Sequence, residues 1–362
     1  MNRRQLIQTG LITAGAGATG CSVARTGVAQ APHMPLESAP HLRTLMQWPV
    51  SVDVYGARDL AAVQSTIADI ANAISDYEPV ALLAAPDAPG LDSRRLSEQV
   101  DIWDIPTDDL WCRDSGPTFV KDPSGGLAVA LIQFNGWGDK QTHTNDARIA
   151  GRVAARLGLP LIDSDVIGEQ GGLEHDGAGT MLAHASCWVN DNRNPGLAPD
   201  QIADRLGRVL GATKMIWAPG VAGADITDYH IDSLARFVAP GTVLIQIDDE
   251  IDRDDPWSVA AHQTLSVLRQ ATDAGGKPLE LIRLPEPVNI RRRGEDFVSS
   301  YVNYYVCNGA VIAPQFGDRR IDAAARELLA SLYPNRDVVQ LNIDALGAAG
   351  GGIHCATQQQ PA

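Results

Sequence analysis

The sequence predicts one cyclic α/β domain, in which a unit of one helix and a few strands recurs along the chain. Apolar residues spaced three and four apart predict amphipathic helices, and these stretches lie at residues 60–77, 146–157, 200–210, 257–272 and 318–333. Short β-branched or apolar runs between them predict strands, at residues 80–84, 127–134, 181–189, 243–247 and 301–312. Successive helices are commonly roughly sixty residues apart, near the upper end of repeat periods. One helix per repeat, about five times over, favours a cyclic assembly over a doubly wound sheet.

Glycine spacing and chain composition argue against other architectures. A dinucleotide-binding sheet needs a glycine fingerprint that closes its first strand, and the sequence has none. No linker rich in proline, glycine or serine divides residues 32–362. We therefore expect a single domain over this range.

The N-terminal segment has the pattern of an export signal. Arg3 and Arg4 precede a weakly apolar stretch of small residues at 9–20, which resembles a twin-arginine signal. Small residues within 27–31 would serve as a cleavage site, so we expect residues 1–31 to be a signal peptide and the protein to be exported to the periplasm or cell envelope. Cys21 lies in a sequence close to a lipoprotein box, which makes it a candidate lipid anchor. The alternative is an unprocessed, disordered N-terminus.

Composition and charge restrict the class of partner. The 362 residues carry a formal net charge of −15, which argues against nucleic acid or an anionic membrane surface, because both bind basic faces. An acidic surface suits a small cationic substrate, although solubility alone explains the charge equally well. No run after the N-terminal segment is long and apolar enough to span a bilayer. The sequence does not indicate an oligomeric state.

The remaining cysteines point to one accessible thiol. Apart from Cys21, they are four well-separated residues with no CxxC pair, which fits neither a disulfide framework nor a zinc site. Cys187 and Cys307 lie in apolar runs, where a buried, unreactive thiol is expected. Cys355 follows three consecutive glycines, which allow close approach of a ligand. An accessible thiol there could be reactive.

A histidine and a carboxylate two positions apart form a second candidate. On an extended chain, His230 and Asp232 share a face, so the pair could act as a base beside its charge partner. Two unrelated polar groups at a strand end are the alternative. From these residues alone, a Cys–His hydrolase using Cys355 and His230 is plausible. We interpret His354 as structural, because neighbours on an extended chain face opposite sides.

A series of polar and glycine-rich motifs runs along the chain. These motifs are Met-Gln-Trp-Pro at 46–49, Trp-x-Arg-Asp-x-Gly-Pro at 111–117, Phe-Asn-Gly-Trp-Gly at 134–138, Glu-Gln-Gly-Gly-Leu-Glu-His-Asp-Gly at 169–177, Asn-Asp-Asn-Arg-Asn-Pro at 190–195, His-Ile-Asp at 230–232, Ser-Tyr-Val-Asn-Tyr-Tyr at 300–305 and Gly-Gly-Ile-His-Cys-x-Thr-Gln-Gln at 351–359. The ordered set resembles the agmatine deiminase and bacterial peptidylarginine deiminase family of the guanidino-group-modifying pentein superfamily. Each motif alone is a weak signal. Their order and combination over nearly the whole chain are specific.

The resemblance implies a five-bladed α/β propeller with its active site at the pseudo-fivefold axis. It implies that Cys355 is the nucleophile and that His230 is the general acid and base. It also implies that Asp114 and Asp232 bind the guanidinium group. Paired carboxylates suit this role, because a guanidinium is planar, permanently charged and rich in donors.

Three further residues are candidates for substrate binding. Asn303 matches an asparagine that lines the family's site. Glu174 matches a position that is Glu or His among relatives, and we expect it to meet the distal end of the substrate. Trp111 is a candidate wall of the pocket, with core packing as an equal alternative. The sequence has no recognisable metal-ligand motif, and we expect neither a metal nor a cofactor.

The resemblance implies hydrolysis of agmatine to N-carbamoylputrescine and ammonia through an S-alkylthiouronium on Cys355. The predicted export signal favours the alternative, an exported peptidylarginine deiminase that forms citrulline in peptides or proteins. Two other classes stay open. A thiol protease would use the same Cys and His but needs an oxyanion hole, and a non-catalytic exported binding protein would keep only the fold.

Overall fold

The computed structural model describes residues 32–91, 95–292, 294 and 297–362. The predicted signal peptide at 1–31, including Cys21, lies outside these residues. Residues 31–362 cluster as one compact unit. Within the described ranges, no helix has both the length and the apolar character needed to cross a membrane.

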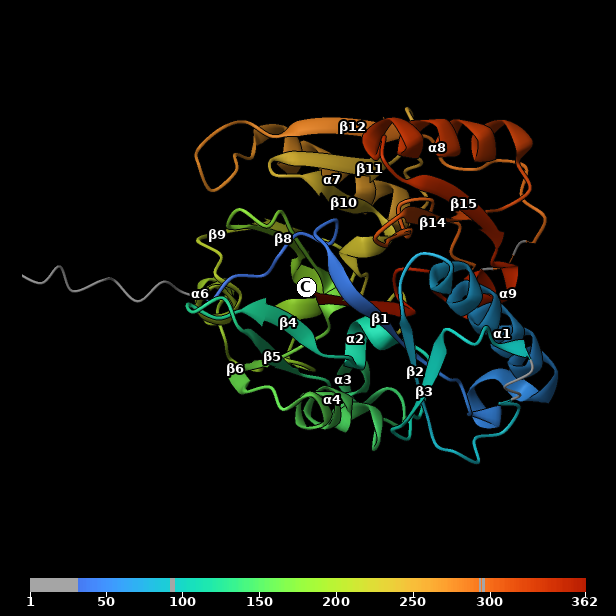
Figure 1. Cartoon of the computed structure of the whole chain (residues 1–362). Coiled ribbons are helices and arrows are strands. Elements are labelled where there is room, and N and C mark those ends of the chain that lie inside the picture. The colour runs from blue at the N-terminus through green and yellow to red at the C-terminus, as the bar shows by residue number, and fades with distance from the viewer. Residues whose placement is uncertain (1–31, 92–94, 293, 295–296) are drawn as a thin grey trace, which may run out of the picture. The chain divides into compact units, whose positions relative to one another are not determined.

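Four three-stranded sheets share one topology (Figure 1). In each sheet, the first strand pairs antiparallel with the second, and the second pairs parallel with the third. In chain order the sheets consist of β4 (Thr118–Lys121), β5 (Leu127–Gln133) and β6 (Leu161–Ile167); β7 (Leu173–His175), β8 (Thr180–His184) and β9 (Lys214–Ala218); β10 (Ala235–Ala239), β11 (Thr242–Gln246) and β12 (Glu280–Leu284); β13 (Tyr305–Val306), β14 (Ala310–Gln315) and β15 (Asp337–Asn342).

A fifth sheet joins the two ends of the described chain. Its strands are β16 (Thr357–Pro361), β1 (His41–Gln47), β2 (Val80–Ala84) and β3 (Val100–Asp104), in that order. The β16–β1 pair is antiparallel, with Thr357 opposite Met46, and the β1–β2 pair is parallel. This sheet therefore repeats the pattern of the other four and adds β3 at its edge. The predicted five-bladed α/β propeller is confirmed.

One long helix connects the second and third strands of each sheet. These helices are α1 (Val52–Ser75), α4 (Ile149–Leu157), α6 (Pro199–Leu210), α7 (Pro256–Gln270) and α8 (Arg319–Leu332). Each coincides with a predicted helical stretch, because an apolar stripe at helical spacing has to be buried against a sheet. In α6 the stripe is Ile202, Leu206 and Val209. Helix α1 starts eight residues before the predicted stretch at 60–77, and Gly56 interrupts its helical backbone.

Short helices occupy the loops between strands: α2 (Cys112–Ser115), α3 (Gly136–Asp139), η2 (Asp146–Arg148), η3 (Gln170–Gly172), α5 (Ala185–Trp188), η4 (Ile231–Ser233) and α9 (Asp344–Ala348). The prediction of one strand over 181–189 is wrong at its end, because β8 stops at His184 and α5 follows. The predicted strand at 301–312 is two strands, β13 and β14, joined by a turn. Apolar runs alone do not separate a buried strand from a buried helical turn.

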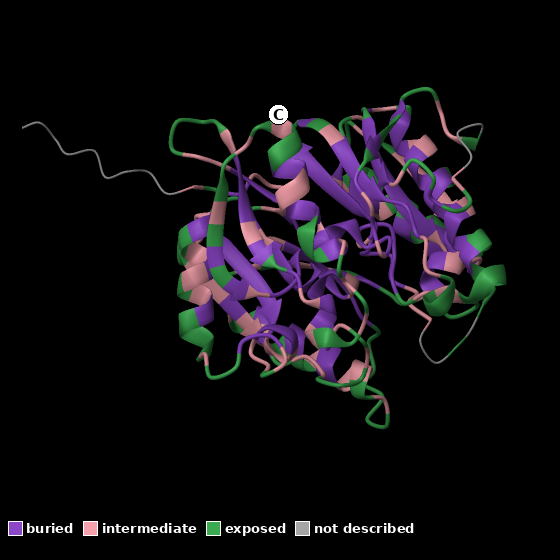
Figure 2. Ribbon diagram, turned by 90° about the horizontal axis from the view of Figure 1, so that it is seen from below, coloured by how far each residue is buried: buried purple, intermediate pink, exposed green. Residues whose placement is uncertain are grey.

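The loops between sheets meet in the interior. Helix α2 contacts η3, and η3 contacts η4. Figure 2 shows buried residues along the strands and in the segments at the centre of the molecule, whereas exposed residues lie on the outer faces of the helices and in the outer loops. Polar motifs at 111–117, 169–177 and 230–232 are thereby brought together although they are far apart in sequence.

Candidate active site

Cys355 lies in the loop between α9 and β16 and is partly exposed. Its Sγ is 3.1 Å from Asn303 Nδ2 and 3.4 Å from Asp232 Oδ2. The backbone of the same loop is held by Asn303, whose Oδ1 accepts from the Cys355 amide at 3.3 Å. Burial raises the pKa of the Cys355 thiol well above its usual value, and the charges of Asp232 and Asp114 raise it further. The Cys355 thiol is therefore protonated at neutral pH.

Asp114 lies in α2 and is buried. Its Oδ1 accepts from the Gly171 amide at 3.2 Å, and its Oδ2 accepts from Trp137 Nε1 at 3.0 Å. Burial raises the pKa of Asp114 to about 6; the nearby carboxylates of Asp232 and Glu169 add to this effect.

Gly171 is the point where the candidate residues converge. A Cβ on this residue would lie 2.5 Å from Asp114 Oδ1, 2.7 Å from His230 Nδ1 and 3.4 Å from Asp232 Oδ2. Any side chain there would collide with two of these groups, so only glycine permits this close approach. The predicted acid–base residue and both predicted carboxylates are therefore neighbours in space.

His230 is held between two carboxylates. Its Nε2 lies 3.3 Å from Glu169 Oε2, and its Nδ1 lies 3.6 Å from Asp114 Oδ1. Although burial opposes the charged form, Asp114 and Glu169 raise the pKa of His230 to about 9. At neutral pH the ring is therefore an imidazolium that can donate a proton.

Glu169 and Arg193 support His230, and sequence reasoning missed both. Arg193 Nε donates to Glu169 Oε1 at 2.9 Å, and Arg193 Nη1 donates to Asp228 Oδ2 at 2.8 Å. All three side chains are buried. Glu169 opens the 169–177 motif and Arg193 belongs to the 190–195 motif. A charged residue inside each of these motifs was the sequence feature that could have identified them as site residues.

Asp232 lies in the short helix η4. The prediction that His230 and Asp232 share one face of an extended strand is therefore wrong. The Leu234 amide donates to the Ile231 carbonyl at 2.9 Å and closes a turn. Nevertheless, this turn keeps the Asp232 carboxylate on the side of Cys355. Asp232 Oδ1 is buried and accepts no hydrogen bond from the part of the chain that the structure describes. An unpaired buried carboxylate oxygen is costly and indicates a place for a ligand donor.

Asn303 and Trp111 also flank the Cys355 loop. Asn303 is fully buried and contacts Cys355 from both ends of its amide. The Trp111 ring packs on the loop backbone, since a Cβ on Gly351 would lie 2.4 Å from Trp111 Cζ3. Trp111 is 9% exposed and belongs to a hydrophobic cluster. The structure therefore places both residues at the site, with Trp111 also part of the core.

Glu174 is engaged within the protein, in contrast to the role predicted from sequence. It lies in β7, where its Oε1 accepts from Arg236 Nε and its Oε2 accepts from the Phe237 amide, both at 3.1 Å. The side chain is 7% exposed. The β7–β8 pairing and the contact with Arg236 draw this carboxylate inward. These contacts do not support the assignment of Glu174 to the distal end of a substrate.

We expect Glu174→Gln to lower stability rather than to change substrate selectivity. The amide nitrogen would face either the Arg236 guanidinium or the Phe237 amide, so a buried donor would lose its acceptor, at a cost of about 1–3 kcal/mol. Urea unfolding of the variant and the wild type measures this difference. The exposed Glu250 provides the control, because Glu250→Gln should change the free energy of unfolding by less than about 0.5 kcal/mol. If Glu174→Gln left stability unchanged and raised the Michaelis constant for agmatine, Glu174 would instead be a substrate-binding residue.

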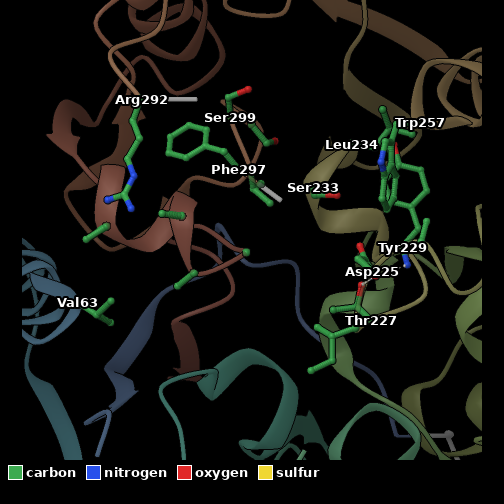
Figure 3. A pocket seen from close by; sticks show the side chains of 18 of the residues that line it. Val63, Asp225, Thr227, Tyr229, Ser233, Leu234, Trp257, Arg292, Phe297 and Ser299 are labelled. Carbon is green, nitrogen blue, oxygen red and sulfur yellow. Dashed lines mark hydrogen bonds between the residues drawn. The ribbon is translucent and has the colours of Figure 1, made fainter. Parts of the chain in front are cut away.

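A cavity of about 880 Å³ adjoins the catalytic segments (Figure 3). Tyr229 and Ser233, the chain neighbours of His230 and Asp232, line it on one side, and Phe297 and Ser299 line it on another. Its volume lies within the range of small-molecule sites, but the four candidate catalytic side chains are not among its lining residues. Among the described residues, no three histidine, cysteine or acidic side chains are placed to hold a metal ion.

The family of the chain follows from comparison with known proteins. The family model of the Porphyromonas-type peptidyl-arginine deiminases matches residues 33–361. The chain belongs to this family. Membership confirms the resemblance drawn from the motifs and the prediction of a hydrolase acting on guanidino carbon–nitrogen bonds.

Individual relatives of this deiminase agree with the family model. A Streptomyces coelicolor protein is 37% identical over 336 residues, which cover 91% of this chain and 98% of that protein. An agmatine deiminase of Medicago truncatula is 34% identical over 364 residues, covering 91% and 96% of the two chains. The solved structure of an Enterococcus faecalis agmatine deiminase superposes with a TM-score of 0.85 at 28% identity, covering 91% of this chain and 96% of that one.

Proposed function

We propose that this deiminase hydrolyses agmatine to N-carbamoylputrescine and ammonia, with Cys355 as nucleophile. The observation that carries the proposal is the unpartnered Asp232 Oδ1 beside a thiol. The similarity to agmatine deiminases of Medicago truncatula and Enterococcus faecalis supports agmatine as the substrate. The net charge of −15 also favours a cationic substrate.

Asp114 and Asp232 would hold two edges of the guanidinium. Both carboxylates border Gly171, and Asp232 also contacts Cys355 Sγ. Two anions can engage separate edges of a planar cation and so align its carbon with the sulfur. The bound cation would also offset the two negative charges that raise the pKa of Cys355, which favours the thiolate only when substrate is present.

The reaction would proceed in two steps. Thiolate attack on the guanidinium carbon gives a tetrahedral adduct, and cleavage of one carbon–nitrogen bond releases ammonia with a proton from the His230 imidazolium. The remaining S-alkylthiouronium is then attacked by water, from which neutral His230 removes a proton. Cleavage of the carbon–sulfur bond forms the carbonyl of the ureido product, and the hydroxyl proton restores the Cys355 thiol in place of the proton that passed to solvent when substrate bound. A covalent intermediate divides one difficult hydrolysis into two easier steps.

Two observations favour peptidyl arginine as a second candidate. Glu174, which was expected to meet the distal amine of agmatine, is already paired with Arg236. The family model is also named for peptidyl-arginine deiminases. In this alternative the same Cys355 chemistry would convert arginine within a peptide to citrulline.

Ammonia release from three substrates tests the proposal. Agmatine, free arginine and an arginyl peptide blocked at both ends would be compared at equal concentration, with Cys355→Ser as the blank. We expect agmatine to have the highest kcat/KM. A preference for the blocked peptide would support the second candidate, and the absence of ammonia from all three would contradict deimination.

The pKa of Asp114 predicts an acid limit of activity. Protonation of Asp114 removes one of the two anions that hold the guanidinium, and its pKa in the empty site is about 6. We therefore expect the slope of log kcat/KM against pH to increase by about one below pH 6. Initial rates between pH 4.5 and 7.5 measure this limb. A slope that does not change across pH 6 would contradict the role of Asp114.

We also propose that the protein is exported by the twin-arginine pathway, on the basis of Arg3, Arg4 and the small-residue stretch that follows them. Replacement of both arginines by lysine should leave the protein in the cytoplasmic fraction of its host. Periplasmic recovery of that variant would contradict this route.

A further inference from the structure

His354 is a buried histidine with a carboxylate on each ring nitrogen. Its Nδ1 lies 2.8 Å from Asp232 Oδ2, and its Nε2 lies 2.9 Å from Glu37 Oε2. The residue is 2% exposed. A carboxylate oxygen only accepts, so each N–H that the ring carries has an acceptor in place. A half-turn of the ring would place carbon atoms against both acceptors, so the two contacts fix its orientation.

Glu37 is itself fixed from the far side. Its Oε2 also receives Arg113 Nη2 at 3.1 Å and Arg236 Nη2 at 2.9 Å, and its Oε1 accepts from the Val306 amide at 3.0 Å. Although burial opposes ionisation, Arg236 and His354 lower the pKa of Glu37 well below its usual value. A buried anion with this many donors is a rigid anchor for the His354 ring.

The contact with His354 determines which oxygen of Asp232 is available. Oδ2 accepts from His354 and lies 3.4 Å from Cys355 Sγ, whereas Oδ1 has no partner within the described chain. Although burial opposes ionisation here too, the hydrogen bond and charge of His354 lower the pKa of Asp232. Asp114 differs, because the chain already supplies donors to both of its oxygens.

We propose that His354 is a positioning residue that, anchored by Glu37, holds the Asp232 carboxylate with Oδ1 directed at the substrate guanidinium. The inference rests on the proposed function, because it assigns how one guanidinium-binding carboxylate is oriented. His354 touches neither the substrate nor the reacting atoms. Small displacements of a binding group can cost about a hundredfold in rate, so loss of the Nδ1 donor should affect agmatine binding and turnover together.

Two isosteric amides separate the roles of the two ring nitrogens. In His354→Asn, the side-chain nitrogen can occupy the place of Nδ1 and still donate to Asp232, but it cannot reach Glu37. In His354→Gln, the nitrogen can occupy the place of Nε2 and meet Glu37, but the Nδ1 donor is lost. We expect the Asn variant to retain kcat/KM for agmatine within about tenfold and the Gln variant to lose about a hundredfold.

A double-mutant cycle tests whether His354 acts through Asp232. Agmatine binding would be measured calorimetrically in the Cys355→Ser background, where no turnover occurs. His354→Gln should weaken binding there, but it should have less than about a threefold effect once Asp232→Asn is also present, since coupled residues are not additive. Equal effects with and without Asp232→Asn would overturn the inference, as would a Gln variant as active as the Asn variant.

His262 provides a control for the general cost of replacing a histidine by glutamine. It lies in α7, where its Nδ1 is 3.0 Å from the Ser258 carbonyl oxygen, so the same substitution removes an Nδ1 contact outside the candidate site. His262→Gln should lower thermal stability while leaving agmatine affinity unchanged. Failure of the wild type to release ammonia from any guanidino substrate would refute the proposed function; equal Asn and Gln variants in an active wild type would refute the positioning role alone.

Discussion

Replacement of Cys355 by serine is expected to abolish ammonia release while leaving agmatine binding in place. Serine keeps the shape of the side chain, and the Asn303 and Asp232 groups around Sγ stay available. A hydroxyl is a far weaker acid than a thiol and a far weaker nucleophile than a thiolate, so serine at this position is much less readily converted to the attacking anion. Turnover should fall by more than about a thousandfold, or about 4 kcal/mol of transition-state stabilisation.

The measurement pairs kcat for ammonia release with agmatine affinity by calorimetry. Cys307→Ala is the matched control, because Cys307 is a buried free thiol that donates to the Ala310 carbonyl, remote from the proposed mechanism. That variant should keep wild-type kcat. A Cys355→Ser variant with a tenth of wild-type activity would contradict the nucleophile assignment, because a tenfold loss is only about 1.4 kcal/mol.

The parts of the fold that the sequence predicted are those whose burial is periodic. Helices α4, α6, α7 and α8 begin and end within a few residues of the predicted stretches. An apolar stripe at helical spacing is buried against the core only when the segment is helical, so the stripe marks the extent of the helix. Strand β2 coincides with the predicted run at 80–84. The run at 181–189 is buried along most of its length whether it is extended or helical, so its composition could not locate the end of β8.

The sequence predicts those site residues whose chemistry can be recognised from the residue itself and its immediate neighbours. Cys355 behind three glycines and the pair at 230 and 232 could be selected without a structure. The residues that hold these side chains in place could not be selected from the sequence, because buried ion pairs join positions that are far apart in the chain. Glu37 and His354 are separated by 317 positions in the chain. For the same reason Glu174 was assigned to the substrate: its partner Arg236 lies 62 positions away.

Replacement of Asp232 or Asp114 by asparagine should each reduce kcat/KM for agmatine by about two to four orders of magnitude. Asparagine keeps the shape but removes a charge facing a buried cation, and breaking one partner of a buried ion pair costs about 3–5 kcal/mol. In Asp232→Asn, the unpartnered Oδ1 loses its charge. In Asp114→Asn, His230 also loses the carboxylate whose charge raises its pKa most, so its capacity to stay protonated declines as well.

This difference allows the roles of Asp114 and Asp232 in binding the guanidinium to be tested separately. Removal of Asp114 should lower the pH at which His230 loses its proton more than removal of Asp232 does, because the Asp114 charge is the larger cause of the raised pKa. The effect of Asp232→Asn should be mainly on binding. Proton-detected titration of His230 in Cys355→Ser and in Cys355→Ser with Asp114→Asn measures the first effect, and calorimetry measures the second. Asp204→Asn, on the exposed face of α6, should change neither. Near wild-type activity in both single asparagine variants would mean that these carboxylates do not bind the guanidinium, because a permanently charged substrate cannot lose an anionic partner in a buried site without a large cost.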